Sequence, residues 1–397
     1  MSAEVTTRDL DAQRRPGSVG AASVGQGAVG VRAVHEMLAQ ADALLETTFA
    51  ELTDALERAA AEGGPDAGFV ASAGAQAGRG PLGVDLVGEL AQRSRHHGKR
   101  LRPVLAHWGW VVAGGGAHTH DDIARVAAAL ELLHLFALIQ DDVMDRSDSR
   151  RGRTTLHVSA AERHRTADGL GDPVLFGDSV ATLVSDLALS EASLLVAPTS
   201  REVRAAWRLM AVELVEGQLL DLTHTAGRRR DLGTSLRIAR FKSGRYTISR
   251  PVQLGALVGG AEPDLVRGLV AWGDLVGDAF AVRDDVLGVW GDPVRTGKPA
   301  GDDLRSGKPT ALLSWASELL PPAARPLLAA CDAGALDDAG VDALQQAMVD
   351  AGVRDRAEQT ITHLVHRSHR ALDELDVDTE AELALRELAE SIAWRAT

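Results

Sequence analysis

The sequence predicts an all-α fold. Apolar residues recur every three or four positions along nearly the whole chain, which is the spacing of one face of an α-helix. We find no convincing run in which apolar and polar residues alternate, as they do in a half-buried strand. The chain has 397 residues, 45% of them hydrophobic, so it can bury a large core.

The helices can be placed in order along the chain. A first helix is expected from about Val31 to Glu62, followed by a loop rich in Gly and Ala to about Pro81. The next helices are expected at residues 82–96, 101–113, 121–145, 173–196, 199–225, 232–257 and 263–290. After a polar, Gly-rich loop over 291–309, shorter helices are expected at residues 309–320, 338–351, 354–374 and 378–394.

The chain is expected to form one domain with an N-terminal extension. Residues 17–30 consist of Gly, Ala, Ser, Val and Gln, a composition typical of disorder. Residues 1–30 are therefore predicted to be a disordered tail. No linker interrupts residues 90–395 and no fixed-period repeat occurs, so residues 31–397 are predicted to be a single all-α domain.

Charge and cysteine content exclude several classes of protein. The net charge of −14 disfavours a nucleic-acid partner, because phosphate backbones require a basic surface. The single cysteine, Cys331, rules out an internal disulfide and fits a reducing cytosol. No stretch approaches the roughly 18 uninterrupted apolar residues of a membrane helix, and the N-terminus lacks a signal-peptide pattern. We therefore expect a cytoplasmic protein that does not insert into membranes.

An apolar helix that ends in three aspartates is the first candidate site. It runs from Glu131 to Asp145 and carries Asp141, Asp142 and Asp145 at its end. Asp141 and Asp145 are four residues apart and so share a helix face. Two like charges at this spacing destabilise a helix by roughly 0.2–0.5 kcal/mol unless a cation lies between them. Carboxylate oxygens are ligands that Mg2+ prefers, which predicts a magnesium site.

A second segment of the same kind follows another long apolar stretch. It runs from Phe280 to Asp292 and carries Asp284, Asp285 and Asp292. Two acidic helix ends that face each other can hold several Mg2+ ions around one diphosphate group. The two segments together therefore predict a site for an anionic, phosphorylated substrate.

The alternative is that these aspartates only terminate helices, since the chain has 56 acidic residues. The pairs at 121–122 and 337–338 fit that alternative, because they stand where helices start and acids cap the first turn. The two motifs instead end helices, where the partial negative charge of the helix dipole disfavours acids without a counter-ion. Their joint occurrence favours a metal site.

Basic residues at a helix start form a candidate anion clamp. Residues 97–103 place Lys99, Arg100 and Arg102 around Gly98. Arginine forks and a lysine charge at such a place suit a diphosphate. The alternative for this segment alone is a solvated basic patch.

Further cations lie close to the first acidic motif or within apolar helices. Arg150 and Arg151 stand on the loop just past Asp145, close in sequence to the expected metal ions. Lys242 is flanked by apolar helix, where a lysine can stabilise negative charge on a leaving diphosphate.

The loop after the second motif carries two more lysines. Lys298 and Lys308 each follow a glycine and bracket Asp302 and Asp303. Lys308 is the weaker candidate, because exposed loop lysines are common.

Taken in order, these five motifs resemble the trans-polyprenyl diphosphate synthase family, which includes farnesyl and geranylgeranyl diphosphate synthases. The resemblance covers roughly residues 90–320 and is closest to geranylgeranyl diphosphate synthases. It implies an isoprenoid-synthase helical bundle around a central active-site cavity, a homodimer, and catalysis by Asp141, Asp145, Asp284 and Lys242. It implies Mg2+ at the two motifs, whose aspartates are Asp141, Asp142, Asp145, Asp284 and Asp285.

The resemblance also implies the substrates and their ligands. Isopentenyl diphosphate would be held by Lys99, Arg102, His134 and Arg151. The allylic diphosphate would be held by Arg150, Lys242 and Lys298, supported by Gln218, Asp221, Ser243 and Asp302. The implied reaction ionises the allylic C–O bond, adds the isopentenyl double bond to the cation and releases a proton.

Two positions depart from the family pattern. Ala281 replaces the usual Gln after the Phe of the second motif, and Gly288 replaces a third aspartate that many members carry. Two rival functions therefore remain. The first is a regulatory subunit without activity, which would be expected to lack the metal-binding carboxylates or the basic clamp. Both are present in this sequence. A terpene cyclase on the same scaffold would need no isopentenyl clamp.

Product length is expected to depend on the helix before the first motif. Ala137 lies four residues before Asp141 and shares its face, and Leu133 lies one turn further. Leu133, Phe136 and Ala137 are therefore predicted to line a tunnel below the metal ions. In the family, one aromatic residue paired with a small one often accompanies C20 products, so geranylgeranyl diphosphate is expected, with the C15 farnesyl product as the alternative.

Overall fold

The computed structural model describes residues 28–62, 82–96, 98–150, 152–227, 230–292 and 300–395. The predicted N-terminal tail lies outside these residues, except that the first helix already begins at Ala28. Arg151 and Lys298, both predicted to bind substrate, also lie outside the described residues.

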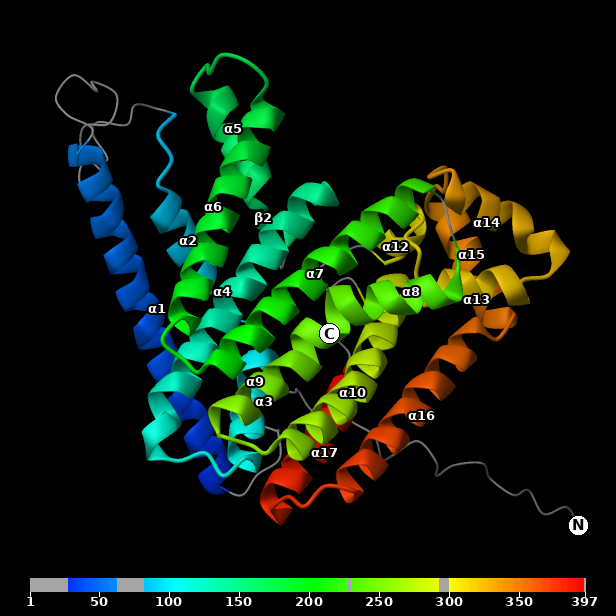
Figure 1. Ribbon diagram of the computed structural model, residues 1–397. Coiled ribbons are helices and arrows are strands. Elements are labelled where there is room, and N and C mark those ends of the chain that lie inside the picture. Colours follow the sequence, from blue (N-terminus) through cyan, green and yellow to red (C-terminus); the bar gives the residue numbers. More distant parts are fainter. Residues whose placement is uncertain are drawn as a thin grey trace, which may run out of the picture.

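The described chain is almost entirely helical, which confirms the predicted all-α fold (Figure 1). The first half contains α1 (Ala28–Glu62), α2 (Leu86–Ser94), α3 (Leu101–Val112), η2 (Ala117–Thr119), α4 (His120–Met144), α5 (Leu156–Thr166) and α6 (Pro173–Val196). The middle contains α7 (Arg201–Gly227), α8 (Leu232–Ile238), η3 (Ala239–Ser249), α9 (Arg250–Val258) and α10 (Pro263–Trp290). The last part contains α12 (Asp302–Arg305), α13 (Ala311–Leu319), η4 (Pro322–Ala324), α14 (Arg325–Asp332), α15 (Asp338–Asp350), α16 (Val353–Asp373) and α17 (Thr379–Ala393).

The long amphipathic helices lie within a few residues of their predicted positions, but three shorter α-helices were not predicted. These are α5, α12 and α14. In α5 the buried face consists mainly of small and polar residues, including His157, Ala160, Ala161 and His164, so the apolar period is weak. A small hairpin also precedes α5, where β1 (Ser149–Arg150) pairs antiparallel with β2 (Arg153–Thr154).

The helix predicted over 232–257 is an unbroken run of three helical elements, α8, η3 and α9, of which η3 is a π-helix. A π-helix has i→i+5 hydrogen bonds, is rare, and is frequently found at functional sites. Gly217 of α7 packs directly on the backbone of η3, because a Cβ at position 217 would overlap the amide nitrogen of Lys242. This close contact brings Lys242 against the C-terminal half of α7.

Three apolar clusters hold the helices together. The first joins α1, α2, α4, α6 and α7, and the second joins α10 to α13–α16. The third joins α3, α9, α10 and α17. In Figure 1, α1, α4 and α6 form one side of the molecule, α10 and α16 the other, and α7 crosses between them. The C-terminal ends of α4 and α10, which carry the acidic motifs, therefore belong to different clusters.

Helix α6 is the one helix in the described part of the chain that is long and apolar enough to cross a membrane by length and composition. Its apolar residues are interrupted by Asp178 and Asp186, so the expectation that no uninterrupted apolar stretch of that length occurs still holds. In the fold, α6 packs against α4 and α5 through Gly177, Ala181, Val184 and Ala188. These contacts give α6 the role of a core helix.

One buried histidine makes the fold sensitive to acid. Both ring nitrogens of His107 in α3 are buried without a hydrogen-bond partner among the described residues. Burial, together with the charge of His120, lowers the pKa of His107 from 6.5 to about 4. The unfolded chain therefore takes up a proton near pH 6.5, whereas the folded protein stays neutral at this position until about pH 4.

We predict that the contribution of His107 to stability is complete above pH 6.5 and falls as the pH is lowered to about 4, by up to about 3 kcal/mol. Replacing His107 with Leu should flatten this part of the stability curve. Urea unfolding between pH 4 and 7 measures it, with exposed His118→Leu as the control. An unchanged pH dependence in His107→Leu would show that other groups cause the acid sensitivity.

Candidate active site

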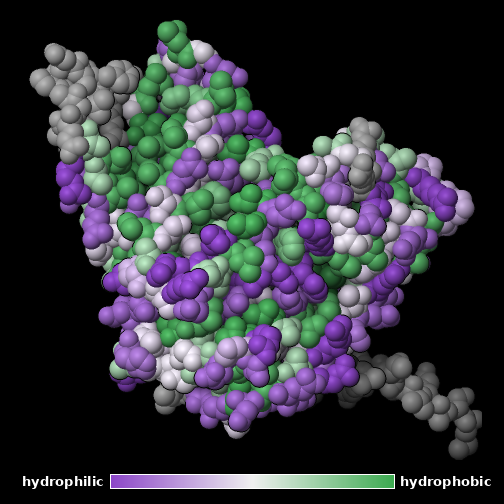
Figure 2. All heavy atoms as spheres, viewed as in Figure 1, coloured by the Kyte–Doolittle hydropathy of each residue, from purple (hydrophilic) through white to green (hydrophobic). Residues whose placement is uncertain are grey.

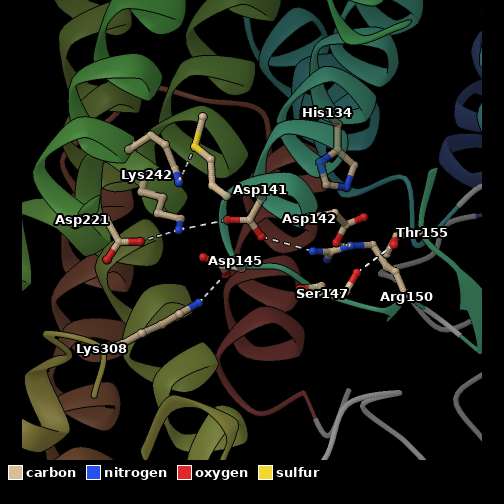
Figure 3. A network of polar contacts seen from close by, with 12 residues as sticks. His134, Asp141, Asp142, Asp145, Ser147, Arg150, Thr155, Asp221, Lys242 and Lys308 are labelled. Atoms are coloured by element: carbon tan, nitrogen blue, oxygen red, sulfur yellow. Dashed lines mark hydrogen bonds and ion pairs between the residues drawn. The ribbon is translucent and has the colours of Figure 1, made fainter. Parts of the chain in front are cut away.

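The C-terminal end of α4 places three carboxylates among basic side chains from three other segments (Figure 3). Arg150 of β1 donates to Asp142 at 2.7 Å and to Asp141 at 3.1 Å. Lys242 of η3 lies 3.0 Å from Asp141. Asp141 and Asp142 therefore share Arg150 as a counter-ion, and Asp141 has Lys242 as a second one.

These cations keep the Asp141 carboxyl ionised although it is enclosed by protein. Burial alone would raise its pKa, but Lys242, Lys308 and Arg150 lower it to about 2. The Oδ1 atom of Asp141 is buried, and its contact among the described residues is the ion pair with Lys242. Asp141 thus presents a charged oxygen that is not saturated by directed hydrogen bonds.

Lys242 connects the first motif to α7. Its Nζ donates to Asp221 at 2.5 Å, so the lysine bridges Asp221 and Asp141 (Figure 3). Burial lowers the pKa of Lys242, but the two carboxylates outweigh that effect and raise it. One turn earlier on α7, Gln218 donates to the sulfur of Met144 at 3.3 Å. The predicted supporting positions on α7 therefore do adjoin the first motif.

Lys308 is a stronger site residue than the sequence indicated. Its Nζ lies 2.6 Å from Asp145 across 163 positions of sequence. Burial lowers its pKa, but Asp303, Asp145 and Asp141 together raise it well above 10.5. Lys308 therefore joins the loop after the second motif to the first motif, a link that spacing alone does not reveal.

The second motif is held by different partners. Asp284 is exposed and pairs with Arg395, which follows α17, at 2.7 Å. Asp285 instead accepts the backbone amide of Ala311 at 3.2 Å, at the start of α13. Loss of solvent and the nearby charges of Asp303 and Asp284 raise the pKa of Asp285 well above its usual value. Only Asp284 of this pair thus keeps an exposed carboxylate.

The third aspartate that the second motif lacks has a counterpart in the next loop. The carboxylate of Asp303 lies over Gly288, so close that a Cβ at position 288 would overlap it. The loop is fixed there because the amide of Gly301 donates to the carbonyl of Gly288 at 3.1 Å. Asp303, which was not named as a site residue from the sequence, therefore lies against α10 beside the predicted Asp302.

The predicted isopentenyl clamp is built around the single tyrosine of the chain, Tyr246. The guanidinium of Arg102 lies 4.3 Å from the centre of the Tyr246 ring and donates to Thr247 at 2.8 Å. The Tyr246 hydroxyl lies 3.5 Å from Nδ1 of His134. Tyr246 was not predicted, because a lone aromatic residue in an amphipathic helix normally indicates only core packing.

The other members of the basic segment before α3 diverge. Lys99 is exposed, whereas Arg100 turns toward α1 and α4 and pairs with Asp42 and Glu131. Arg100 adopts a left-handed backbone conformation, with φ of 52°, just before α3 begins. The solvated-patch alternative thus does not describe Arg100, which ties helices together.

The predicted tunnel residues lie on the inner part of α4. Leu133 is fully buried in the first apolar cluster, while Phe136 and Ala137 are partly buried against it. Ser243 is half-buried in η3, beside Lys242. Ala281 is buried in α10, so a larger side chain there would have to displace its neighbours.

The donor chemistry of the site fits Mg2+. Among the described residues, no three His, Cys, Asp or Glu side chains converge closely enough to enclose an ion by themselves. Mg2+ commonly takes only one or two carboxylates and completes its shell with water and phosphate oxygens. The buried Oδ1 of Asp141 and the exposed carboxylate of Asp284 suit that partial role.

Comparison with known proteins decides the family. The model of the polyprenyl synthetase family matches residues 85–348. The chain belongs to the polyprenyl synthetase family. The match covers both acidic motifs, the basic segment before α3 and the lysines of η3 and α12–α13, so the family resemblance seen in the sequence is confirmed.

Within the polyprenyl synthetases, similar proteins make products of several lengths. The chain is 36% identical over 223 residues to the (2E,6E)-farnesyl diphosphate synthase of Mycobacterium tuberculosis, covering 55% of this chain and 56% of that protein. It is 30% identical over 308 residues to the geranylfarnesyl diphosphate synthase of Aeropyrum pernix, covering 75% and 90%. The chain thus matches little more than half the length of the mycobacterial relatives.

A solved structure supports the same fold. The geranylgeranyl pyrophosphate synthase of Corynebacterium glutamicum, complexed with isoprenyl diphosphate and magnesium, is 33% identical. It superposes with a TM-score of 0.77 and covers 90% of this chain and 99% of its own. The predicted isoprenoid-synthase bundle is therefore confirmed as the fold.

We predict that Lys308→Met destabilises the metal-free protein by about 2 kcal/mol, because Asp145 and Asp303 lose their shared cation. Mg2+ should restore part of that loss by supplying positive charge. Thermal unfolding in EDTA and in Mg2+ measures both effects, and Arg305→Gln, whose partner Asp338 is exposed, serves as a control in the same loop. Equal destabilisation of Lys308→Met in both buffers would contradict a shared place for lysine and metal.

Proposed function

We propose that this protein is a Mg2+-dependent trans-prenyltransferase that condenses isopentenyl diphosphate with an allylic diphosphate. The observation that carries the proposal is the pair of lysine bridges at the end of α4, where Lys242 joins Asp141 to Asp221 and Lys308 joins Asp145 to the next loop. A site that already balances several buried charges can accept a diphosphate and its metal ions with little reorganisation. Membership of the polyprenyl synthetase family supports the same chemistry.

The residues of the chain have distinct roles in the proposed reaction. Lys242, Arg150 and Lys298, the last of which lies outside the described residues, hold the allylic diphosphate and stabilise its charge as the C–O bond breaks. Arg102 and His134, with Lys99 and Arg151, hold isopentenyl diphosphate so that its double bond attacks the allylic carbon. A new C–C bond forms and a proton is lost from the isopentenyl unit.

Mg2+ held by Asp141, Asp145 and Asp284 would neutralise charge on the leaving diphosphate. The apolar inner part of α4 excludes water from the allylic cation, which water would otherwise trap as an alcohol. Asp221 keeps Lys242 protonated and oriented between substrate turnovers.

Incubation of the purified protein with isopentenyl diphosphate and allylic diphosphates of 5, 10 or 15 carbons tests the proposal. We expect a longer prenyl diphosphate in Mg2+ and none in EDTA. Asp141→Asn and Asp145→Asn should each lower turnover by several orders of magnitude while circular dichroism stays unchanged, because removal of a metal ligand removes charge stabilisation in the transition state. Near-normal turnover in either variant would exclude these aspartates as metal ligands.

The rival function, a terpene cyclase, is separated by the same incubation. A cyclase releases hydrocarbon or alcohol from an allylic diphosphate and needs no isopentenyl diphosphate. The contacts of Arg102 and His134 with Tyr246 favour condensation, since they preserve a second anion site. Ala281, which replaces the Gln usual in the family, is the reason for testing cyclase activity.

We propose geranylgeranyl diphosphate, with 20 carbons, as the main product and the C15 farnesyl product as the alternative. Each added isoprene unit buries about five carbons, worth roughly 3–4 kcal/mol at about 0.8 kcal/mol per methylene. Growth therefore continues until a side chain blocks the tunnel. Phe136 and Ala137 are partly buried on α4 before the acidic motif, which supports their role as its floor.

We predict that Phe136→Ser yields products longer than 20 carbons and that Ala137→Phe shifts the product toward 15 carbons. The first change removes an aromatic ring from the tunnel floor, and the second adds one. Chromatography of the dephosphorylated products measures the length. The same length distribution in both variants as in the unmodified protein would remove these residues from the tunnel floor.

We further propose a homodimer that forms through α6 and α7. Exposed large apolar side chains recur along α7 at helical spacing, and others continue on α6 (Figure 2). Those on α7 are Leu209, Val212, Val215, Leu219 and Leu222. A row of large exposed apolar side chains of this kind is uncommon on a monomer and typical of a subunit interface. We also propose that the protein is cytoplasmic, which its single, buried Cys331 supports.

We predict that Leu219→Glu converts the dimer to a monomer, because two charges would be buried at the symmetric interface. Leu383→Glu on α17 is the matched control, since Leu383 is 56% exposed and Leu219 is 53% exposed. Analytical ultracentrifugation measures the mass. Loss of the dimer in both variants, or in neither, would place the interface elsewhere.

A further inference from the structure

The segment after α17 is fixed against the second acidic motif. Arg283, the residue before Asp284, donates from Nε to the carbonyl of Ala393 at 2.7 Å. The same guanidinium makes two bonds to Glu358 of α16, at 2.9 Å and 2.6 Å. The end of α17 is therefore anchored to α10, and the anchoring residue directly adjoins an expected metal ligand.

This anchor delivers Arg395 to the carboxylate of Asp284. The two side chains are 2.7 Å apart, and the guanidinium carbon of Arg395 lies 3.8 Å from the centre of the Phe280 ring. The side chain of Arg395 is 10% exposed, whereas that of Asp284 is 60% exposed. The arginine is thus seated on an aromatic face, and its carboxylate partner remains open to solvent.

The hydrogen-bonding capacity of Arg395 is not used up by this contact. Its Nη1 is buried without a hydrogen-bond partner among the described residues, and the same holds for Nε of Arg102. Burial lowers the pKa of Arg395, and the positive charges of Arg283 and Arg102 lower it further. The Asp284 carboxylate raises this pKa but does not fully offset these effects. Two buried guanidinium groups with unused donors, close enough for the charge of Arg102 to affect Arg395, form a place where an anion would be stabilised.

We propose that Arg395 exchanges its anion during the reaction: it neutralises Asp284 before metal binds, and it binds isopentenyl diphosphate beside Arg102 once Mg2+ occupies Asp284. This proposal rests on the proposed function. It assigns a site residue outside the motifs of the sequence.

The exchange follows from charge. A divalent ion bound to Asp284 supplies more positive charge than the guanidinium of Arg395 that it replaces. If both stayed in contact with the same carboxylate, the metal ion and the guanidinium would repel each other. The displaced guanidinium already has an unused donor and a nearby arginine, so a diphosphate gives it a charge-assisted hydrogen bond. The Phe280 ring can retain the planar group through the change.

Metal binding provides the first test, with a readout other than activity. The probe is Mn2+, alone and with inorganic diphosphate, followed by electron paramagnetic resonance of the free ion. In Arg395→Gln, Mn2+ alone should bind about three- to five-fold more tightly than in the unmodified protein, because the competing cation is gone. Arg395→Lys keeps the charge and should stay near the unmodified affinity.

Arg386→Gln is the matched control for the metal test. Arg386 also belongs to the α17 region, but it pairs with Asp373 and Glu382 away from the motif, so Mn2+ affinity should not change. Unchanged or weaker Mn2+ binding by folded Arg395→Gln would overturn the exchange. The variant Asp284→Asn tells failure of the exchange apart from failure of the proposed function. If Asp284→Asn binds Mn2+ as well as the unmodified protein does, Asp284 is not a metal ligand, and both proposals lose that residue.

Steady-state kinetics provide the second test. Arg395→Gln should raise the KM for isopentenyl diphosphate about ten-fold or more, while kcat and the KM for the allylic diphosphate stay within about two-fold. A residue with only a structural role would instead change all three or none. An unchanged KM for isopentenyl diphosphate would overturn the second half of the exchange, whatever the Mn2+ result.

Discussion

The active site depends on internal neutralisation of the carboxylates at the end of α4. Asp141 and Asp145 would repel each other at the negative end of a long helix, and the protein prevents this with Lys242, Lys308 and Arg150. Each of these cations comes from a different segment, so the pairing also fixes where those segments lie. The site is thereby charge-balanced before any substrate arrives.

Much of the surrounding fold follows from bringing those cations to α4. The absence of a side chain at Gly217 lets α7 contact η3, which sets Lys242 between Asp221 and Asp141. The absence of a side chain at Gly288 leaves room for Asp303, which helps to hold the charge of Lys308. The close-packed helices on either side provide the apolar surroundings in which these few charges act strongly.

Sequence alone predicted the helices and the acidic motifs because both depend on local spacing. The shared face of Asp141 and Asp145 is such a case. The sequence could not reveal contacts between residues far apart in the chain, such as Lys308 with Asp145 or Arg395 with Asp284. No local spacing of residues encodes such contacts. The π-helix of η3 was missed for a related reason, since its apolar pattern reads as an ordinary α-helix and its form depends on packing against α7.

The central claim is that diphosphate binds tightly only when metal ions are present, because Lys242 and Lys308 are already paired with carboxylates. Isothermal titration of the protein with inorganic diphosphate, in Mg2+ and then in EDTA, tests this directly. The account predicts clear binding in Mg2+ and at least about ten-fold weaker binding in EDTA, where diphosphate must compete with Asp221 and Asp145 for Lys242 and Lys308. Equal affinity in both buffers would contradict it.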